Sequence, residues 1–122
     1  MTMYNGKKIY EGLLFMKSMQ SLGNIENQAI ADRQRAFMAG IDCGSALLDD
    51  GFSRSVDRGA ICDLLEFLSS GKYQVLVVEN IYDITTNEEN LKVMIDRINA
   101  MGVIIFDLST MTARFNNYAE EC

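Results

Sequence analysis

The chain of 122 residues has the length of one domain and the composition of a folded protein, with 48% hydrophobic and 23% charged residues. A domain of this size buries roughly two thirds of its unfolded surface, so its folding requires no disulfide or metal. The formal net charge of −6 is unfavourable for binding DNA, because Lys and Arg side chains must neutralise the phosphates. Any contact with DNA must therefore be local or supplied by a partner.

The sequence contains no His, which excludes Ser-His and Cys-His nucleophilic catalysis and His-ligated metals. Its three cysteines, Cys43, Cys62 and Cys122, are widely spaced and indicate neither a disulfide framework nor a zinc site. We expect reduced thiols, with Cys62 in the core. No apolar run approaches the roughly 20 residues that span a bilayer, and the N-terminus lacks a signal peptide. The sequence thus predicts a soluble cytoplasmic protein with no membrane partner.

The first half of the chain predicts a strand, a helix and a second strand. A mostly apolar run over residues 9–16 is typical of a buried strand. Asn24 is suited to cap a helix that continues to Gly40 through residues of high helix propensity. The short apolar run 46–48 lies between Gly44 and an Asp-Asp-Gly turn, which predicts a second strand.

A second helix and a central strand are predicted next. The helix begins at Asp57, carries its apolar residues on one face and ends at Gly71. The run 74–78 is apolar without polar alternation, which indicates a parallel strand covered on both faces. The apolar face of the helix consists of Ile61, Leu64, Leu65 and Leu68.

A third helix and a fourth strand follow. Asn87 is a suitable N-cap with acidic residues behind it, and Gly102 ends the helix before the strand 103–106. Residues 111–122 have mixed polarity and predict a tail or a partial helix. The apolar stripe of this third helix consists of Leu91, Met94, Ile95 and Ile98.

Alternating strands and helices predict a single α/β domain over residues 1–122, with its core in 9–110. We expect a mainly parallel central sheet of about four to five strands with helices on both faces. Open parallel sheets bind ligands beyond the carboxyl ends of their strands, so the following loops should carry any chemistry. The polar residues of those loops are Ser18, Asp49, Asp50, Tyr82, Asp83 and Asp107.

Five segments occur in an order typical of one protein family. They are LLFMKS (13–18), GNIENQ (23–28), DDGFSRSVDRG (49–59), LSSGKYQVLVVENIYDITTN (68–87) and MGVIIFDLST (101–110). In this joint order the chain resembles the N-terminal catalytic domain of serine recombinases (resolvases and invertases), including the large serine recombinases of conjugative transposons and phages. The resemblance implies a resolvase-like fold and site-specific recombination of a mobile element, with DNA cleaved through a phosphoserine intermediate.

The resemblance also implies roles for individual residues. Ser18 holds the position of the nucleophile, and Arg58 holds that of a phosphate-binding arginine. Three further arginines of the family pattern are replaced here by Met16, Asp83 and Thr86. One arginine that faces a transferring phosphoryl group is worth about 10³ to 10⁵ in rate, so the domain is expected to be impaired or inactive as an enzyme.

Structural interpretations of these residues stay open beside the catalytic ones. Serines after strands commonly serve in turns, which applies to Ser18. Arg58 is also compatible with a solvated helix surface, or with a local basic patch that includes Arg54 and Lys17. Lys17 should not replace the arginine lost at position 16, because neighbouring strand residues face opposite sides.

The acidic residues near the turns give no reason to predict a cofactor. Asp49 and Asp50 are adjacent carboxylates in a turn, and we predict no magnesium or other metal site there. Tyr82 and Asp83 also allow an acidic pocket for another ligand, although nothing else in the sequence supports one.

Three hypotheses follow. The first is an inactive recombinase homologue with DNA as its partner, alone or as a homo-oligomer. The second is a non-catalytic regulator that forms a hetero-assembly with an active recombinase. The third, a nucleotide-binding or phosphate-binding module, requires a glycine-rich loop, which Gly51, Gly59 and Gly71 do not form.

Overall fold

The computed structural model of the chain describes residues 2–4, 7–17, 22–49 and 59–114. Its central sheet has the strand order β3-β2-β4-β5-β6, and β1 pairs with the beginning of β2. The strands are β1 (Thr2–Tyr4), β2 (Lys7–Lys17), β3 (Ile41–Asp49), β4 (Val75–Val78), β5 (Ile104–Asp107) and β6 (Thr112–Arg114). The helices are α1 (Leu22–Met38), α2 (Gly59–Ser69), the short 3-10 helix η1 (Ile81–Asp83) and α3 (Glu88–Ala100).

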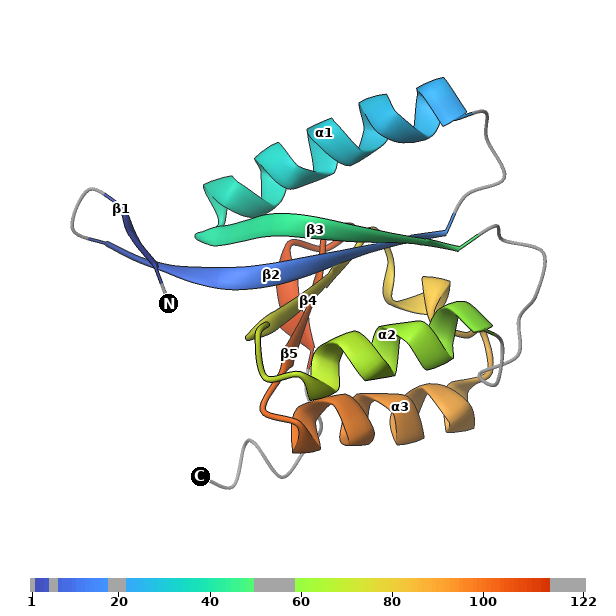
Figure 1. Cartoon of the computed structure of the whole chain (residues 1–122). Helices are drawn as coiled ribbons and strands as arrows, with labels where there is room; N and C mark the ends of the chain where they lie inside the picture. The colour runs from blue at the N-terminus through green and yellow to red at the C-terminus, as the bar shows by residue number, and fades with distance from the viewer. Residues whose placement is uncertain (1, 5–6, 18–21, 50–58, 115–122) are drawn as a thin grey trace.

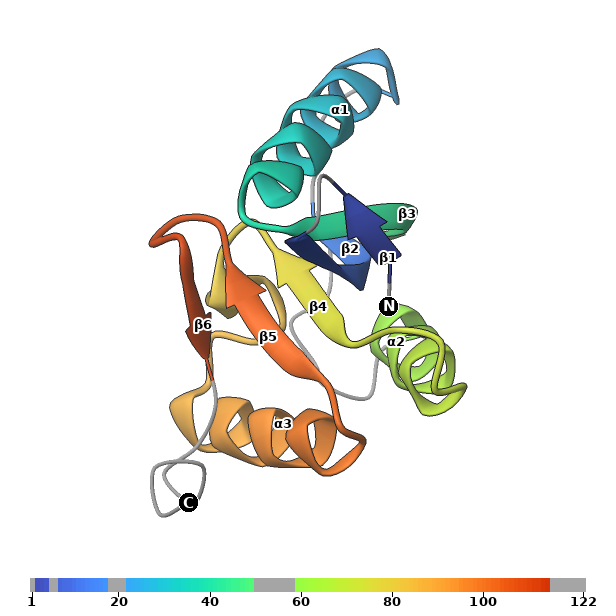
Figure 2. The same cartoon turned by 90° about the vertical axis from the view of Figure 1, so that its left-hand side faces the viewer.

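The sheet is mainly parallel and lies between two helical layers (Figures 1 and 2). Strands β3, β2, β4 and β5 run parallel, whereas β1 and β6 are antiparallel to their neighbours. Helix α1 covers one face, and α2 with α3 covers the other. The predicted α/β fold with helices on both faces is therefore confirmed. Among the described helices, none is long and apolar enough to cross a membrane.

The side chains of β2 enter two separate cores. Leu13 and Phe15 pack against α2 and α3, while Leu14 and Met16 pack on the side of α1. Both faces of this strand are therefore buried over residues 13–16, which explains why this part of its sequence is apolar without alternation. All four residues of β4 are buried as well, as predicted for a central strand.

Helix α3 begins and ends where its capping residues predict. The Asn87 side chain accepts a hydrogen bond from the backbone N–H of Asn90 at 3.0 Å. At the other end Gly102 adopts φ +81°, and the N–H of Val103 donates to the carbonyl of Ile98 at 3.3 Å. These bonds satisfy groups that the helix leaves without an intrahelical partner.

Several boundaries differ from the sequence-based prediction. Helix α1 begins at Leu22, so Asn24 lies inside it rather than capping it. Strand β3 begins at Ile41, five residues before the predicted apolar run, because its first half gains its stability from pairing with β2. Residues Thr112–Arg114 form strand β6 on the edge of β5, where a tail or a partial helix was expected. Strand β1 was not predicted either.

The cysteine prediction was wrong about which thiol is in the core. Cys62 is exposed, because it follows the inward-facing Ile61 and so points about 100° away from it around α2. Cys43 on β3 is the buried cysteine. Burial raises the pKa of its thiol to about 12, so it remains protonated and unreactive.

A close approach between strands requires glycine at position 12. A Cβ added to Gly12 would lie 2.5 Å from Cγ2 of Ile41 and 3.2 Å from Sγ of Cys43. The register between β2 and β3 shifts at this point, and Gly44 is the additional residue on β3. A Cβ at Gly44 would meet nothing within 4 Å.

We predict that Gly12→Ala lowers the free energy of unfolding by about 1–3 kcal/mol, the usual cost of overpacking a core. The added methyl group must displace Ile41, which is itself buried. Urea denaturation measures the effect, and Gly44→Ala is the matched control, with a change below about 0.5 kcal/mol. Equal losses in both variants would contradict the predicted contact at Gly12.

Candidate functional site

The strand order defines where a ligand would bind. Strand β2 is flanked by β3 on one side and β4 on the other, so the chain changes direction across the sheet beside β2. Parallel sheets of this kind bind ligands at the carboxyl ends of the strands next to such a switch point. The segment after β4, with η1, and the turn after β5 lie at this end (Figure 1).

The two residues predicted to be catalytic, Ser18 and Arg58, lie outside the described residues. The same holds for Asp50 and Arg54. The backbone of β2 is described as far as Lys17, which pairs with Asp49 at the end of β3. The roles of Ser18 and Arg58 therefore stay predictions.

Met16 is completely buried in the core that α1 covers. It pairs with Leu48 in the register of β2 and β3, and its core includes Leu14, Val77 and Ala36. The side chain at this position is thus a packing residue. It presents no charge or hydrogen-bond donor at the carboxyl edge of the sheet.

The segment after β4 is ordered by its own hydrogen bonds. The Asn80 side chain accepts a hydrogen bond from the N–H of Tyr82 at 2.9 Å and so caps η1. The Tyr82 hydroxyl donates to Oε1 of Glu88 at 3.1 Å, while Thr85 is buried and its Oγ1 accepts from the N–H of Asn87 at 3.2 Å. Asp83 is half-buried and Thr86 exposed, so the two positions where arginines were expected offer a carboxylate and a hydroxyl.

Asp107 has a structural role rather than an evident chemical one. It is buried at the end of β5, where Oδ2 accepts a hydrogen bond from the N–H of Ile81 at 3.2 Å. Its Oδ1 accepts from the N–H and the hydroxyl of Ser109 at 2.8 and 2.5 Å. The carboxylate therefore joins η1 to the turn after β5.

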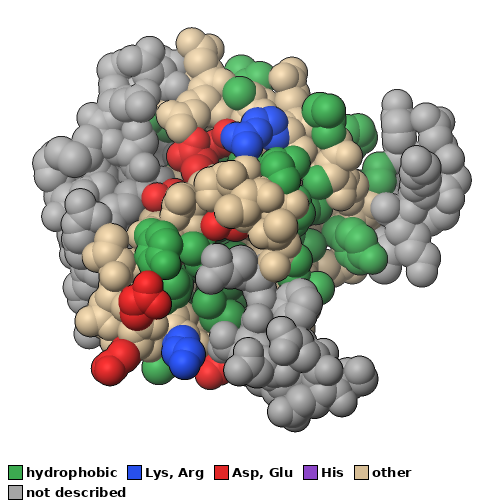
Figure 3. All heavy atoms as spheres, turned by 180° about the vertical axis from the view of Figure 1, so that it is seen from behind, with side chains coloured by type: hydrophobic (Ala, Val, Ile, Leu, Met, Phe, Trp, Pro, Cys, Tyr) green, Lys and Arg blue, Asp and Glu red, His purple; other side chains and the backbone are tan. Residues whose placement is uncertain are grey.

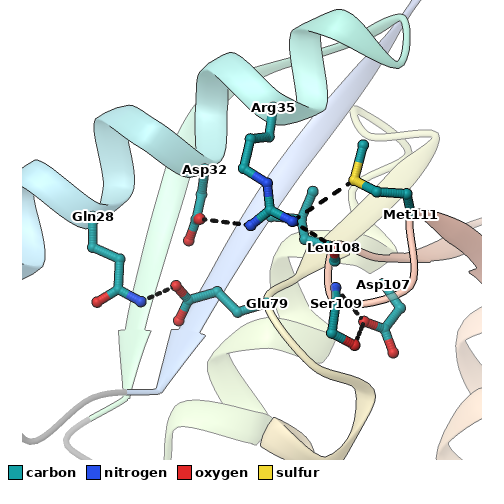
Figure 4. Close-up of polar contacts among 8 residues, drawn as sticks. All are labelled: Gln28, Asp32, Arg35, Glu79, Asp107, Leu108, Ser109 and Met111. Atoms are coloured by element: carbon teal, nitrogen blue, oxygen red, sulfur yellow. Dashed lines mark hydrogen bonds and ion pairs between the residues drawn. The ribbon is translucent and has the colours of Figure 1, made fainter.

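A second polar cluster lies between α1 and this edge (Figure 4). The Gln28 side chain donates a hydrogen bond to Oε2 of Glu79, directly after β4. One turn along α1, Asp32 points toward the same carboxylate. Arg35 lies with Nη1 3.8 Å from Oδ1 of Asp32 and donates from Nη2 to the carbonyl of Leu108 at 2.6 Å.

Sequence reasoning missed this cluster, although a signal was present. Asp32 lies at helical spacing from Ile25, Ala29 and Ala36, which face the core on the inner side of α1. An acid in such a stripe is buried by the same geometry that buries its neighbours. Asp32 is only 3% exposed.

The electrostatics of the edge are acidic. Burial, the hydrogen bond to Glu79 and the charge of Glu79 together raise the pKa of Asp32 to about 8, whereas the charge of Arg35 acts in the opposite direction. Asp83 adds another negative charge. Over the described ranges, no group of three or more His, Cys, Asp or Glu side chains is arranged to hold a metal ion.

An apolar groove lies at the other end of the sheet. It has a volume of about 430 Å³, and Tyr10 and Ile104 in its lining are 43% and 45% exposed. Figure 3 shows hydrophobic side chains gathered toward the side of the molecule where the parallel strands begin. The groove is lined by Tyr10, Ala39, Ile41, Gln74, Val75, Gly102, Ile104, Phe106 and Ala113.

Several solved structures share this fold, among them three catalytic or recombinase domains. The N-terminal catalytic domain of TP901-1 integrase matches with a TM-score of 0.69 at 13% identity, over 84% of this chain and 80% of that chain. The C-terminal catalytic domain of ISC1926 TnpA, an IS607-like serine recombinase, gives 0.68 at 15% identity, over 80% and 68%. A resolvase family site-specific recombinase from Streptococcus pneumoniae gives 0.67 at 16% identity, over 93% and 80%.

These likenesses confirm the resolvase-like fold that the segment order implied, and at such identities they show the fold alone. No family model matches the sequence, and a search of curated proteins gave no match.

We predict that Asp107→Asn lowers the free energy of unfolding by about 1–3 kcal/mol, because an amide cannot accept all the hydrogen bonds that the carboxylate accepts. Urea denaturation measures the loss. Asp63→Asn on the exposed side of α2 is the control and should change stability by less than about 0.5 kcal/mol. If Asp107→Asn leaves the free energy of unfolding unchanged, the carboxylate does not stabilise the junction of η1 and β5.

Proposed function

We propose that this chain is a resolvase-like serine recombinase catalytic-domain homologue, derived from the recombination machinery of a mobile element, that no longer cleaves DNA at a useful rate. The observation that carries this proposal is the chemistry of three positions. Met16, Asp83 and Thr86 stand where the resemblance implies arginines.

The reaction of the family requires those arginines. The hydroxyl oxygen of a serine attacks a DNA phosphorus, a phosphoserine bond forms, and the bond to one deoxyribose oxygen breaks. Negative charge grows on the phosphoryl oxygens during this exchange and must be stabilised by nearby cations or donors. In other phosphoryl-transfer enzymes one arginine at the transferring group is worth about 10³ to 10⁵ in rate, so we expect the loss of three to leave no useful turnover.

The described surroundings of the missing arginines supply no replacement. Met16 is enclosed by apolar side chains, and Asp83 carries a charge that repels a phosphate by about 1 kcal/mol in water and by more in a shielded site. Arg35 is held to the carbonyl of Leu108. Weak binding of DNA by the isolated domain follows from the same charges.

Trapping of a covalent protein–DNA adduct on a nicked suicide substrate tests whether the chain has lost DNA cleavage. We predict that the wild-type protein forms no covalent adduct with DNA taken from the ends of its own genetic element, as measured by denaturing gel electrophoresis. An active serine recombinase on its own site shows that the trap works. An adduct that disappears in Ser18→Ala would refute the proposed loss of cleavage.

A non-catalytic assembly partner of an active recombinase is the second candidate, favoured by the apolar groove at the beginning of the parallel strands. Tyr10 and Ile104 are large apolar side chains that remain more than two fifths exposed beside Phe106 and Val75. Contiguous apolar surface of this kind marks interaction sites more often than isolated exposed residues do. An intact recombinase encoded by the same element is the partner that this candidate implies.

We predict that Ile104→Glu reduces co-purification with that recombinase at least ten-fold, which corresponds to about 1.4 kcal/mol of binding free energy. A buried carboxylate at the centre of an apolar contact is poorly solvated. Val93→Glu on α3 is the matched control, because Val93 is 57% exposed and outside the groove. Equal co-purification by both variants and the wild type would exclude the groove as the assembly surface.

A further inference from the structure

On the inner side of α1 a buried acid, Asp32, faces a half-buried acid, Glu79. Asp32 is 3% exposed, and the side-chain neighbours on its helix face, Ile25, Ala29 and Ala36, are apolar. The carboxylate of Glu79 approaches it from the end of β4 (Figure 4). Two such groups resist ionising together, since like charges in a shielded site repel strongly.

The hydrogen-bond pattern of Asp32 is incomplete if both acids are ionised. Its Oδ2 is buried and has no protein donor among the described residues. Arg35 is 3.8 Å from Oδ1, too far for a hydrogen bond, and its other terminal nitrogen is committed to the carbonyl of Leu108. A proton retained by Asp32 supplies the missing donor, because a neutral carboxyl group can donate to Glu79.

We propose that Asp32 and Glu79 share a proton which holds α1 against the carboxyl end of β4, and that loss of this proton at mildly alkaline pH loosens the helix. In this pair Asp32 is the donor and Glu79 the acceptor, and the side-chain amide of Gln28 donates a second hydrogen bond to Oε2 of Glu79. The pair thus acts as a pH-sensitive latch on α1. This proposal does not depend on whether the chain cleaves DNA.

The charged groups around the pair fix the direction of the switch. Glu79 after β4 and Asp83 in η1 oppose ionisation of Asp32, as does burial, and Arg35 on α1 favours it. From the turn after β5, the carbonyl of Leu108 engages Arg35 rather than Asp32. The described side chains that β2 directs toward α1, Leu14 and Met16, carry no charge.

The sign of the pH dependence follows. The folded protein holds the Asp32 proton up to about pH 8, whereas the unfolded chain releases it near the ordinary aspartate pKa of 3.8. Between these values folding takes up a proton, so the folded population falls as pH rises. This one group lowers the ratio of folded to unfolded protein by up to about ten-fold per pH unit until the folded pKa is passed.

Asp32→Asn tests the latch, because asparagine keeps a donor for Glu79 and cannot ionise. We expect the stability difference between Asp32→Asn and the wild type, from urea denaturation at pH 5 to 9, to grow with pH and to level off near pH 8. Asp63→Asn on α2 should follow the wild type throughout. Parallel pH profiles for the wild type and Asp32→Asn would overturn the proposal.

Infrared spectroscopy gives a readout that does not rely on stability. A carbonyl-stretch band of a protonated carboxylic acid should be present in the folded wild type at pH 7, disappear above pH 8 and be missing in Asp32→Asn. In Glu79→Gln the band should disappear at a lower pH, because the neighbouring negative charge is gone. This second variant keeps the test decisive if Asp32→Asn does not fold.

Two outcomes would overturn the proposal. One is the absence of the band at pH 7. The other is a loss of wild-type stability on adding EDTA, which would indicate that a metal cation occupies the place of the proton.

Discussion

The burial of β2 on both faces is the constraint on which the rest of the structure depends. Leu13 and Phe15 enter one core, and Leu14 and Met16 enter the other, so every side chain in this stretch is committed to packing. Gly12 allows β3 to lie close to this strand, because a Cβ at this position would collide with Ile41 and crowd Cys43.

The same constraint decides what the candidate site can offer. An apolar side chain at position 16 completes the core beneath α1 but brings no donor to the edge of the sheet. Described polar side chains at the carboxyl edge of the sheet stabilise the protein itself. Asp107 joins η1 to the turn after β5, and Arg35 joins α1 to that turn.

Much of the fold could be predicted because its signals are local. Asn87 and Gly102 define α3 through their own backbone geometry, and the uninterrupted apolar run of β4 marks a strand with both faces covered. The first half of β3 and the short strand β6 depend on a partner strand, so their sequences alone do not indicate them. Asp32 was missed for a related reason. Its place on the inner face of α1 follows from helical spacing, but its interaction partner, Glu79, lies 47 positions further along the chain. The sequence spacing around Asp32 and Glu79 does not indicate that the two acids meet.

The additional residue at Gly44 has a consequence for how this molecule meets others. Among the described strands, β3 pairs only with β2, and its outer edge carries backbone groups that a foreign strand could join. The bulge disrupts the regular spacing of those groups midway along the strand, next to the exposed Ser45 and Ala46. An incoming strand can therefore match one half of the edge but not both, which guards the sheet against growing by aggregation.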